Sequence, residues 1–219
     1  MEEEKNQEED NTTYDEQLKI ILLGEIFTGK SSLINAYIKN KFNAQEPSTI
    51  SPTNYSRKIR LKNKTILANV WDTAGQEHFR SMNKIFIKNS NIVLFVYDIT
   101  RKTTLKELSF WVEYTDNIIG KTNALFGVIA NKIDLFDKEK ELKEKNNDIE
   151  MVTTLEGQEF ANNIGAKFLE TSAKENAPGL QEFIDQMVEE YCDKFLLEQK
   201  EESIQLNIIQ PNEKKKSCC

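Results

Sequence analysis

Cysteine, histidine, proline and glycine are all scarce in this sequence. Its 219 residues include three cysteines, one histidine, four prolines and eight glycines. Cys218 and Cys219 are adjacent, so we expect no disulfide framework, and the low glycine and proline content excludes a collagen-like chain. No apolar run reaches the ~20 residues of a membrane-spanning helix, and the charged first residues contain no apolar signal region. We therefore expect a soluble protein of a reducing, intracellular compartment.

Negative charge is concentrated at the start of the chain. Residues 1–16 contain eight acidic side chains and one lysine, a net charge of −7, which is also the net charge of the whole sequence. The remainder is therefore neutral, and it provides no basic field that would recruit nucleic acid. The acidic segment has almost no apolar side chains to bury, so we expect residues 1–17 to form a disordered tail. A solvated tail is favoured over a dedicated binding arm.

Short apolar runs alternate with helical segments through the rest of the chain. We expect strands over residues 18–23, 55–62, 65–71, 92–98, 125–130 and 167–170, and helices near residues 30–39, 103–119, 153–164 and 179–198. This alternation predicts one α/β domain over residues 18–198, with a mainly parallel sheet covered by helices on both faces. We expect the apolar stripe of the last helix to pack on the sheet, with Cys192 as a small buried hydrophobe.

Two charged segments fall outside this alternation. Residues 136–150 are charged, contain two asparagines and have little periodicity, which is typical of a surface insertion. Residues 199–219 are expected to form a flexible tail that ends in the two cysteines.

A phosphate-binding loop is predicted between the first strand and the first helix. Residues 24–31, Gly-Glu-Ile-Phe-Thr-Gly-Lys-Ser, fit the pattern G-x-x-x-x-G-K-[ST] in the structural context that the pattern requires. Such a loop points backbone N–H groups at an anion, and the helix N-terminus adds a partial positive charge. Lys30 would neutralise the outer phosphates, and the Ser31 hydroxyl would bind Mg²⁺. The loop alone does not say which nucleotide binds.

Two further elements follow predicted strands. After the third strand, Asp72 can hold Mg²⁺ through water, the Gly75 N–H can reach a γ-phosphate, and Gln76 can orient an attacking water. After a later strand, the carboxylate of Asp134 can accept hydrogen bonds from N1–H and the C2 amine of guanine, and adenine offers neither donor. The segment Ser172–Lys174, after the last strand, can supply a backbone N–H to the guanine carbonyl.

These motifs, in this order, resemble the small GTPase superfamily, and within it the Rab family most. The matches are GxxxxGKSSL at residues 24–33, WDTAGQE at 71–77, VYDIT at 96–100, NKID at 131–134, ETSAK at 170–174 and the terminal cysteine pair. The resemblance implies a three-layer, Ras-like P-loop NTPase fold with a six-stranded, mainly parallel sheet and one antiparallel edge strand. Phe42 stands where the family has an aromatic that stacks on guanine, and Thr49 where the first switch threonine binds Mg²⁺ and senses the γ-phosphate.

The resemblance also implies a site for GTP or GDP with Mg²⁺. The implied nucleotide-binding residues are Gly24, Glu25, Ile26, Phe27, Thr28, Gly29, Lys30, Ser31, Ser32, Phe42, Thr49, Asp72, Gly75, Asn131, Lys132, Asp134, Ser172, Ala173 and Lys174. Ser31, Thr49 and Asp72 are the implied metal ligands, and Gln76 is the implied catalytic residue.

The function implied by the family is a GTP-hydrolysing molecular switch of vesicle and membrane trafficking. Its implied partners are an exchange factor, a GTPase-activating protein, effectors and escort or dissociation-inhibitor proteins, and the chain would act as a monomer. Cys218 and Cys219 resemble prenyl acceptors, and two lipid chains would anchor the protein stably to the cytoplasmic face of an intracellular membrane, with a cytosolic pool. Lys214, Lys215 and Lys216 would add attraction to anionic lipid.

The phosphate loop departs from the family at two positions. Relatives mostly have glycine or serine where this chain has Ile26 and Phe27. An incoming arginine finger and Gln76 must both approach the γ-phosphate near Ile26, so we expect nucleotide affinity to be kept and hydrolysis to be slow. The alternative is that the loop shifts and points both side chains outward.

The first switch and its surroundings also differ from relatives. Pro52 follows the switch threonine, where it removes a backbone donor, so we expect an unusual effector choice. His78 replaces a common arginine, and we interpret it as a surface residue because Gln76 already fills the water-positioning role.

Two other functions remain open from the sequence. One is a GTP-loaded membrane recruitment module with negligible hydrolysis, which Ile26 and Phe27 favour. The other is a P-loop kinase for a small metabolite, which the absence of an arginine-rich lid segment and the presence of Asp134 disfavour.

Overall fold

The sheet has the mixed topology that the sequence predicts. The computed structural model describes residues 13–43, 49, 52–73, 80–120, 123–136 and 151–196. The strands are β1 (Glu16–Leu23), β2 (Thr53–Leu61), β3 (Lys64–Asp72), β4 (Ile92–Asp98), β5 (Leu125–Asn131) and β6 (Lys167–Glu170). They lie in the order β2-β3-β1-β4-β5-β6. Among the described strands, only β2 and β3 pair antiparallel, so the expectation of six strands with one antiparallel edge strand is confirmed.

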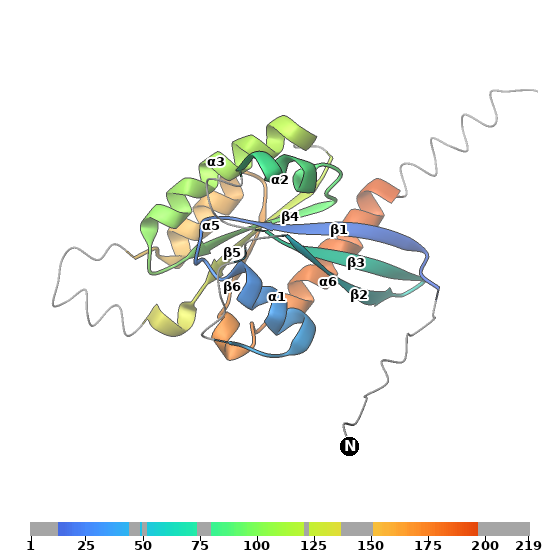
Figure 1. Ribbon diagram of the computed structural model, residues 1–219, viewed down its shortest axis with the longest axis horizontal. Coiled ribbons are helices and arrows are strands. Elements are labelled where there is room, and N and C mark those ends of the chain that lie inside the picture. Colours follow the sequence, from blue (N-terminus) through green and yellow to red (C-terminus); the bar gives the residue numbers. More distant parts are fainter. Residues whose placement is uncertain are drawn as a thin grey trace, which may run out of the picture.

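Helices cover both faces of the sheet (Figure 1). They are α1 (Lys30–Lys39), α2 (Arg80–Ile87), α3 (Lys102–Ile119), α5 (Thr154–Asn163) and α6 (Leu180–Tyr191), with a π-helical turn at Cys192–Leu196 and 3₁₀ turns at Ile133–Leu135 and Ala173–Glu175. Helices α1 and α6 lie on one face, and α2, α3 and α5 lie on the other. The domain is therefore three-layered, as the resemblance implies.

Helix α2 is not predicted from the sequence. Its apolar residues are Met82, Ile85, Phe86 and Ile87, within a segment of eight residues. Ile85 is 75% exposed, whereas Ile87 is buried in the core. A helix of eight residues makes little more than two turns, which is shorter than the window of about 11–18 residues over which a helical period is recognised.

The core is built on the buried strands of the sheet and the apolar faces of the helices. Every residue of β4 and β5 is buried, as expected for strands covered on both faces. The apolar stripe of α6 packs on the sheet, and Cys192 is 3% exposed beside it, so both expectations are confirmed. Strand β1 begins two residues before the apolar run, because the parallel ladder to β3 extends down to the pair Glu16 and Ile66.

The topology gathers the sequence motifs at one edge of the sheet. Strands β1, β3, β4, β5 and β6 are parallel to one another, so the loops that follow them emerge at the same edge. Open α/β sheets bind ligands at this edge. Among the described residues, no helix combines the length and the apolar composition needed to cross a membrane.

Candidate nucleotide-binding site

Two glycines allow the loop between β1 and α1 to pass close to its neighbours. Gly24 has φ +144° and Gly29 has φ +94°. A Cβ at Gly24 would fall on the backbone carbonyl of Val96, and a Cβ at Gly29 would fall on the side-chain amide of Asn131. The two glycines of the motif are therefore required by close approach as well as by backbone conformation.

Lys30 lies inside this loop. Its side chain is buried, and Nζ donates to the carbonyls of Gly24 at 2.9 Å and Glu25 at 2.8 Å. Burial lowers the pKa of Lys30 to about 8, an effect that the nearby carboxylates of Asp72 and Glu25 oppose. Burial disfavours the charged form of Lys30, and an anionic ligand such as a phosphate group would stabilise that form.

Three oxygen-bearing side chains converge beside Lys30. The hydroxyl oxygens of Ser31 and Thr49 are 2.6 Å apart, and Thr49 donates to Oδ2 of Asp72 at 3.1 Å. Asp72 is buried, and its Oδ1 is enclosed without a hydrogen-bond partner in the described structure. Burial raises the pKa of Asp72, and hydrogen bonds from Ser31 and Thr49 and the charge of Lys30 oppose the rise.

This group fits the ligand set expected for Mg²⁺. Hydroxyl and carboxylate oxygens are the ligands that Mg²⁺ prefers, and the unpaired Oδ1 of Asp72 gains a partner when a cation or its bound water is present. Across the part of the chain that the structure describes, no group of three or more His, Cys, Asp or Glu side chains forms another candidate metal site.

A cavity of about 310 Å³ lies beside the phosphate loop. The predicted site residues that line it are Phe27, Gly29, Ser32, Phe42, Asn131, Lys132, Asp134, Ala173 and Lys174. Asn43 and Leu135 also line it, and the sequence reading missed both because neither belongs to a motif. The cavity combines a few polar groups with apolar walls, which is typical of a small-molecule site.

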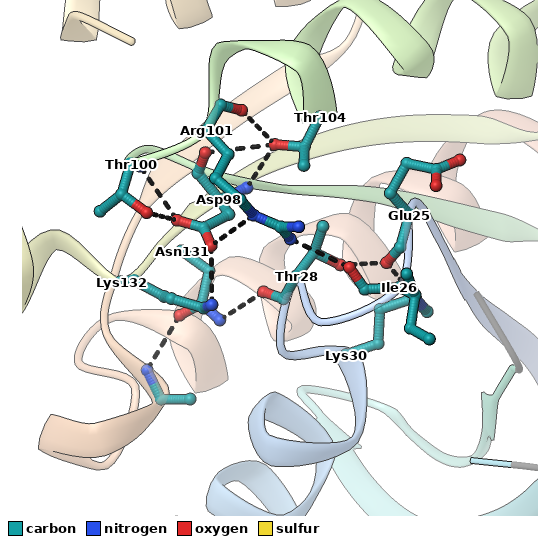
Figure 2. Close-up of polar contacts among 11 residues, drawn as sticks. Glu25, Ile26, Thr28, Lys30, Asp98, Thr100, Arg101, Thr104, Asn131 and Lys132 are labelled. Atoms are coloured by element: carbon teal, nitrogen blue, oxygen red, sulfur yellow. Dashed lines mark hydrogen bonds and ion pairs between the residues drawn. The ribbon is translucent and has the colours of Figure 1, made fainter. Parts of the chain in front are cut away.

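Asn131 and Asp134 are held by hydrogen bonds at the cavity wall. Asn131 donates from Nδ2 to the Thr28 carbonyl at 2.8 Å and accepts from the backbone N–H of Ala173 at 3.0 Å (Figure 2). Asp134 accepts from the Ser172 hydroxyl at 2.6 Å, and its side chain is 9% exposed. Three loops that are far apart in the sequence are thus tied together, and the Asp134 carboxylate is oriented before any ligand binds.

A charged cluster beside the phosphate loop was not singled out as a site from the sequence. The buried carboxylate of Asp98, at the end of β4, contacts Nζ of Lys132 at 2.7 Å and Nε of Arg101 at 3.2 Å. Burial works against the ionised form, but the hydrogen bonds from Lys132 and Thr100 lower the pKa of Asp98. The sequence signal for this cluster is Asp98, a carboxylate that ends the otherwise apolar strand β4. The neighbouring strands carry site residues at their corresponding ends.

Some predicted residues lie outside the described part of the chain. These are Gly75 and Gln76 of the second switch, and Cys218 and Cys219 of the lipidation site. Pro52 is described but His78 is not. The roles of the four undescribed site residues stay predictions.

Comparison with known proteins identifies the family. The family model described as Ras family matches residues 19–193, and Ras-related protein Rab-21 of Homo sapiens is 35% identical over 168 residues, which cover 76% of this chain and 69% of that protein. This chain belongs to the Rab branch of the Ras family. GTP-binding protein YPT52 of Saccharomyces cerevisiae is 29% identical over 81% of this chain and 82% of its own length. Ras-related protein RABA2a of Arabidopsis thaliana is 34% identical over 74% and 69%.

Membership explains the chemistry of the site in general terms. Proteins of the Ras family are GTPases that bind GTP and GDP with Mg²⁺. The site of this Rab-branch protein has a buried lysine, a cluster of magnesium-type oxygens and a carboxylate at the base cavity, in positions that suit such a ligand.

Proposed function

We propose that this protein is a GTP-hydrolysing switch that recruits effectors to an intracellular membrane in vesicle trafficking. The observation that carries the proposal is the convergence of Lys30, the oxygens around Asp72 and the Asp134 carboxylate from three separate loops. The membership of the Rab branch supports the trafficking role.

Each part of the site has an assigned role in the proposal. Lys30 and the loop N–H groups bind the phosphates, and Mg²⁺, held by Ser31, Thr49 and Asp72, would neutralise charge that develops on them. Gln76 orients the attacking water. When Thr49 loses its contact with the γ-phosphate and Mg²⁺ after hydrolysis, the first switch is released, and effectors that recognise the held form dissociate.

The geometry at the base cavity supports guanine over adenine. The Asp134 carboxylate is nearly buried and oriented by Ser172. Guanine offers it two N–H donors, whereas adenine would leave it facing a lone pair, with a cost of several kcal/mol. Discrimination of ~10⁴ is attainable from such a site.

Membrane attachment in the proposal depends on the C-terminal tail. Prenylation of Cys218 and Cys219, together with the preceding lysines, would anchor the protein to the cytoplasmic face of a membrane. Exchange factors, activating proteins and dissociation inhibitors would move it between the two nucleotide states and between membrane and cytosol.

Calorimetry with purified protein and Mg²⁺ tests the nucleotide assignment. We expect GTP and GDP to bind at least 10³-fold more tightly than ATP, and GDP to copurify with the protein. The variant Asp134→Asn should lose most of its affinity for GTP, because an amide cannot accept from both N–H donors. The exposed control Glu113→Gln should bind as the wild type does. Equal affinity for GTP and ATP would contradict the proposal.

A second candidate function is a GTP-loaded recruitment module with negligible turnover. Bulk at Ile26 and Phe27 favours this function: Phe27 is 64% exposed, whereas Ile26 is only partly exposed. Single-turnover phosphate release separates the two functions. If the protein turns over, Gln76→Leu should reduce the rate and Ile26→Ser should raise it; if the protein is inactive, Gln76→Leu should change nothing.

A further inference from the structure

Three consecutive carbonyls of the phosphate loop accept hydrogen bonds from cations. Lys30 occupies the carbonyls of Gly24 and Glu25, and Nη2 of Arg101 donates to the carbonyl of Ile26 at 2.9 Å. Figure 2 shows Arg101 reaching this carbonyl from the loop that follows β4. Lys30 belongs to the phosphate-loop motif, whereas Arg101 belongs to none of the recognised motifs and lies 75 residues away from Ile26.

Arg101 is itself held from two directions. Its Nε contacts the buried Asp98 carboxylate at 3.2 Å, and Thr104 donates to its backbone carbonyl at 2.7 Å. Asp98 is in turn shared with Lys132 of the base-reading loop. The planar guanidinium therefore bridges a buried carboxylate and a backbone carbonyl at once, an arrangement that a lysine cannot reproduce with a single ammonium.

The residue that these contacts hold is Phe27. It has φ +63°, which is a strained conformation for a bulky side chain, and the carbonyls on both sides of it are occupied: Ile26 by Arg101 and Thr28 by Asn131. Because the peptide unit is planar and trans, fixing the direction of the Ile26 carbonyl also fixes the opposite direction of the Phe27 N–H. The Phe27 side chain then stands at the wall of the base cavity, which Phe42 also lines.

We propose that Arg101 is a positioning residue of the nucleotide site, which fixes the peptide between Ile26 and Phe27 and thereby slows the release of bound guanine nucleotide. The inference rests on the proposed function. Release requires the phosphate loop to loosen around its ligand. Arg101 opposes this loosening by holding the loop backbone, without contacting the ligand. Arg101 touches neither the phosphates nor the base in this role.

Release of a fluorescent N-methylanthraniloyl GDP from the full-length protein, with Mg²⁺ present, tests the inference. Arg101→Ala should release the nucleotide about tenfold faster, as expected for loss of one charge-assisted hydrogen bond at a partly exposed position. Its association rate and its binding stoichiometry of one should not change. Arg101→Lys should release the nucleotide at a rate between those of the wild type and Arg101→Ala, because lysine keeps the positive charge but lacks the planar guanidinium. The matched control is Arg60→Ala, an exposed arginine on the edge strand β2.

The outcomes separate the inference from the proposed function. If the wild type binds no labelled GDP, the proposed function is wrong. If the wild type binds and Arg101→Ala releases within twofold of its rate, only the role of Arg101 is wrong. A fall in stoichiometry with no change in release from the bound fraction would assign Arg101 to general folding, and would also overturn the inference.

Discussion

Gly29, in the phosphate loop, lies against the side-chain amide of Asn131 in the base-reading loop. Its φ of +94° and the position of the Asn131 amide leave no room for a side chain. Asn131 uses that amide to hold the Thr28 carbonyl. The absence of a side chain at Gly29 therefore allows the contact that joins the phosphate loop to the base-reading loop.

Replacement of this glycine is expected to weaken nucleotide binding. In Gly29→Ala the new Cβ displaces the Asn131 amide and breaks its bond to Thr28, so we expect GDP affinity to fall at least tenfold, about 1.4 kcal/mol. A fluorescence titration with labelled GDP measures this. Gly165→Ala is the matched control, because Gly165 has φ +67° but nothing within 4 Å of its added Cβ. If both variants lose affinity equally, a general weakening of the fold is responsible and the close approach to Asn131 is not.

Helix α5 begins with a complete capping box that also connects it to α3. The Thr153 side chain accepts from the N–H of Glu156, and Glu156 Oε2 accepts from the N–H of Thr153. The other oxygen of Glu156 contacts Nζ of Lys102, at the start of α3, at 2.7 Å. The hydrogen bond from Lys102 is the main reason that the pKa of Glu156 is lowered to about 2.

This lowered pKa predicts a pH-dependent contribution to stability. Because the folded pKa lies below the unfolded value of about 4.3, the stabilisation is fully present above pH ~5 and is lost as the pH falls towards 2. Urea unfolding of Glu156→Gln, which keeps the cap but loses the charge, should show lower stability than the wild type at pH 7. The two should converge between pH 5 and pH 2. A difference at pH 3 as large as at pH 7 would contradict the assigned ion pair.

Element boundaries show what local pattern predicts and what it misses. The helix at residues 30–39 and the strand at 92–98 match α1 and β4, because the phosphate-loop motif is followed by a helix and the strand is a continuous apolar run. The last helix was expected to reach residue 198, but regular α-helix ends at Tyr191 and a π-helical turn follows. The apolar stripe continues through that turn, so periodicity alone cannot locate the change in hydrogen bonding.

The whole domain is expected to gain stability from its ligand, because the site joins segments from across the sheet. Loops after β1, β5 and β6 all contribute to the base cavity, and Asp72 ends β3. A nucleotide that binds only the folded state at a thousand times its Kd stabilises it by about 4 kcal/mol.

Thermal unfolding with and without nucleotide measures this coupling. GDP with Mg²⁺ should raise the midpoint by several degrees, and removal of Mg²⁺ with a chelator should reverse part of the rise, since the oxygens around Asp72 then lose their ligand. ATP at the same concentration is the control and should have little effect. An equal rise with ATP would show that the base cavity does not select guanine.

The sequence by itself determined the family, the mainly parallel sheet and most of the candidate site. These follow from short segments, such as Gly24–Ser31, in which residue types and spacing carry the chemistry locally. The tertiary structure decided which distant segments meet. Strand order places the loops after β1, β4 and β5 side by side, so Arg101 reaches Ile26 and Asn131 reaches Thr28 across 75 and 103 residues. Such contacts depend on the order of the strands in space, and no local pattern in the chain encodes that order.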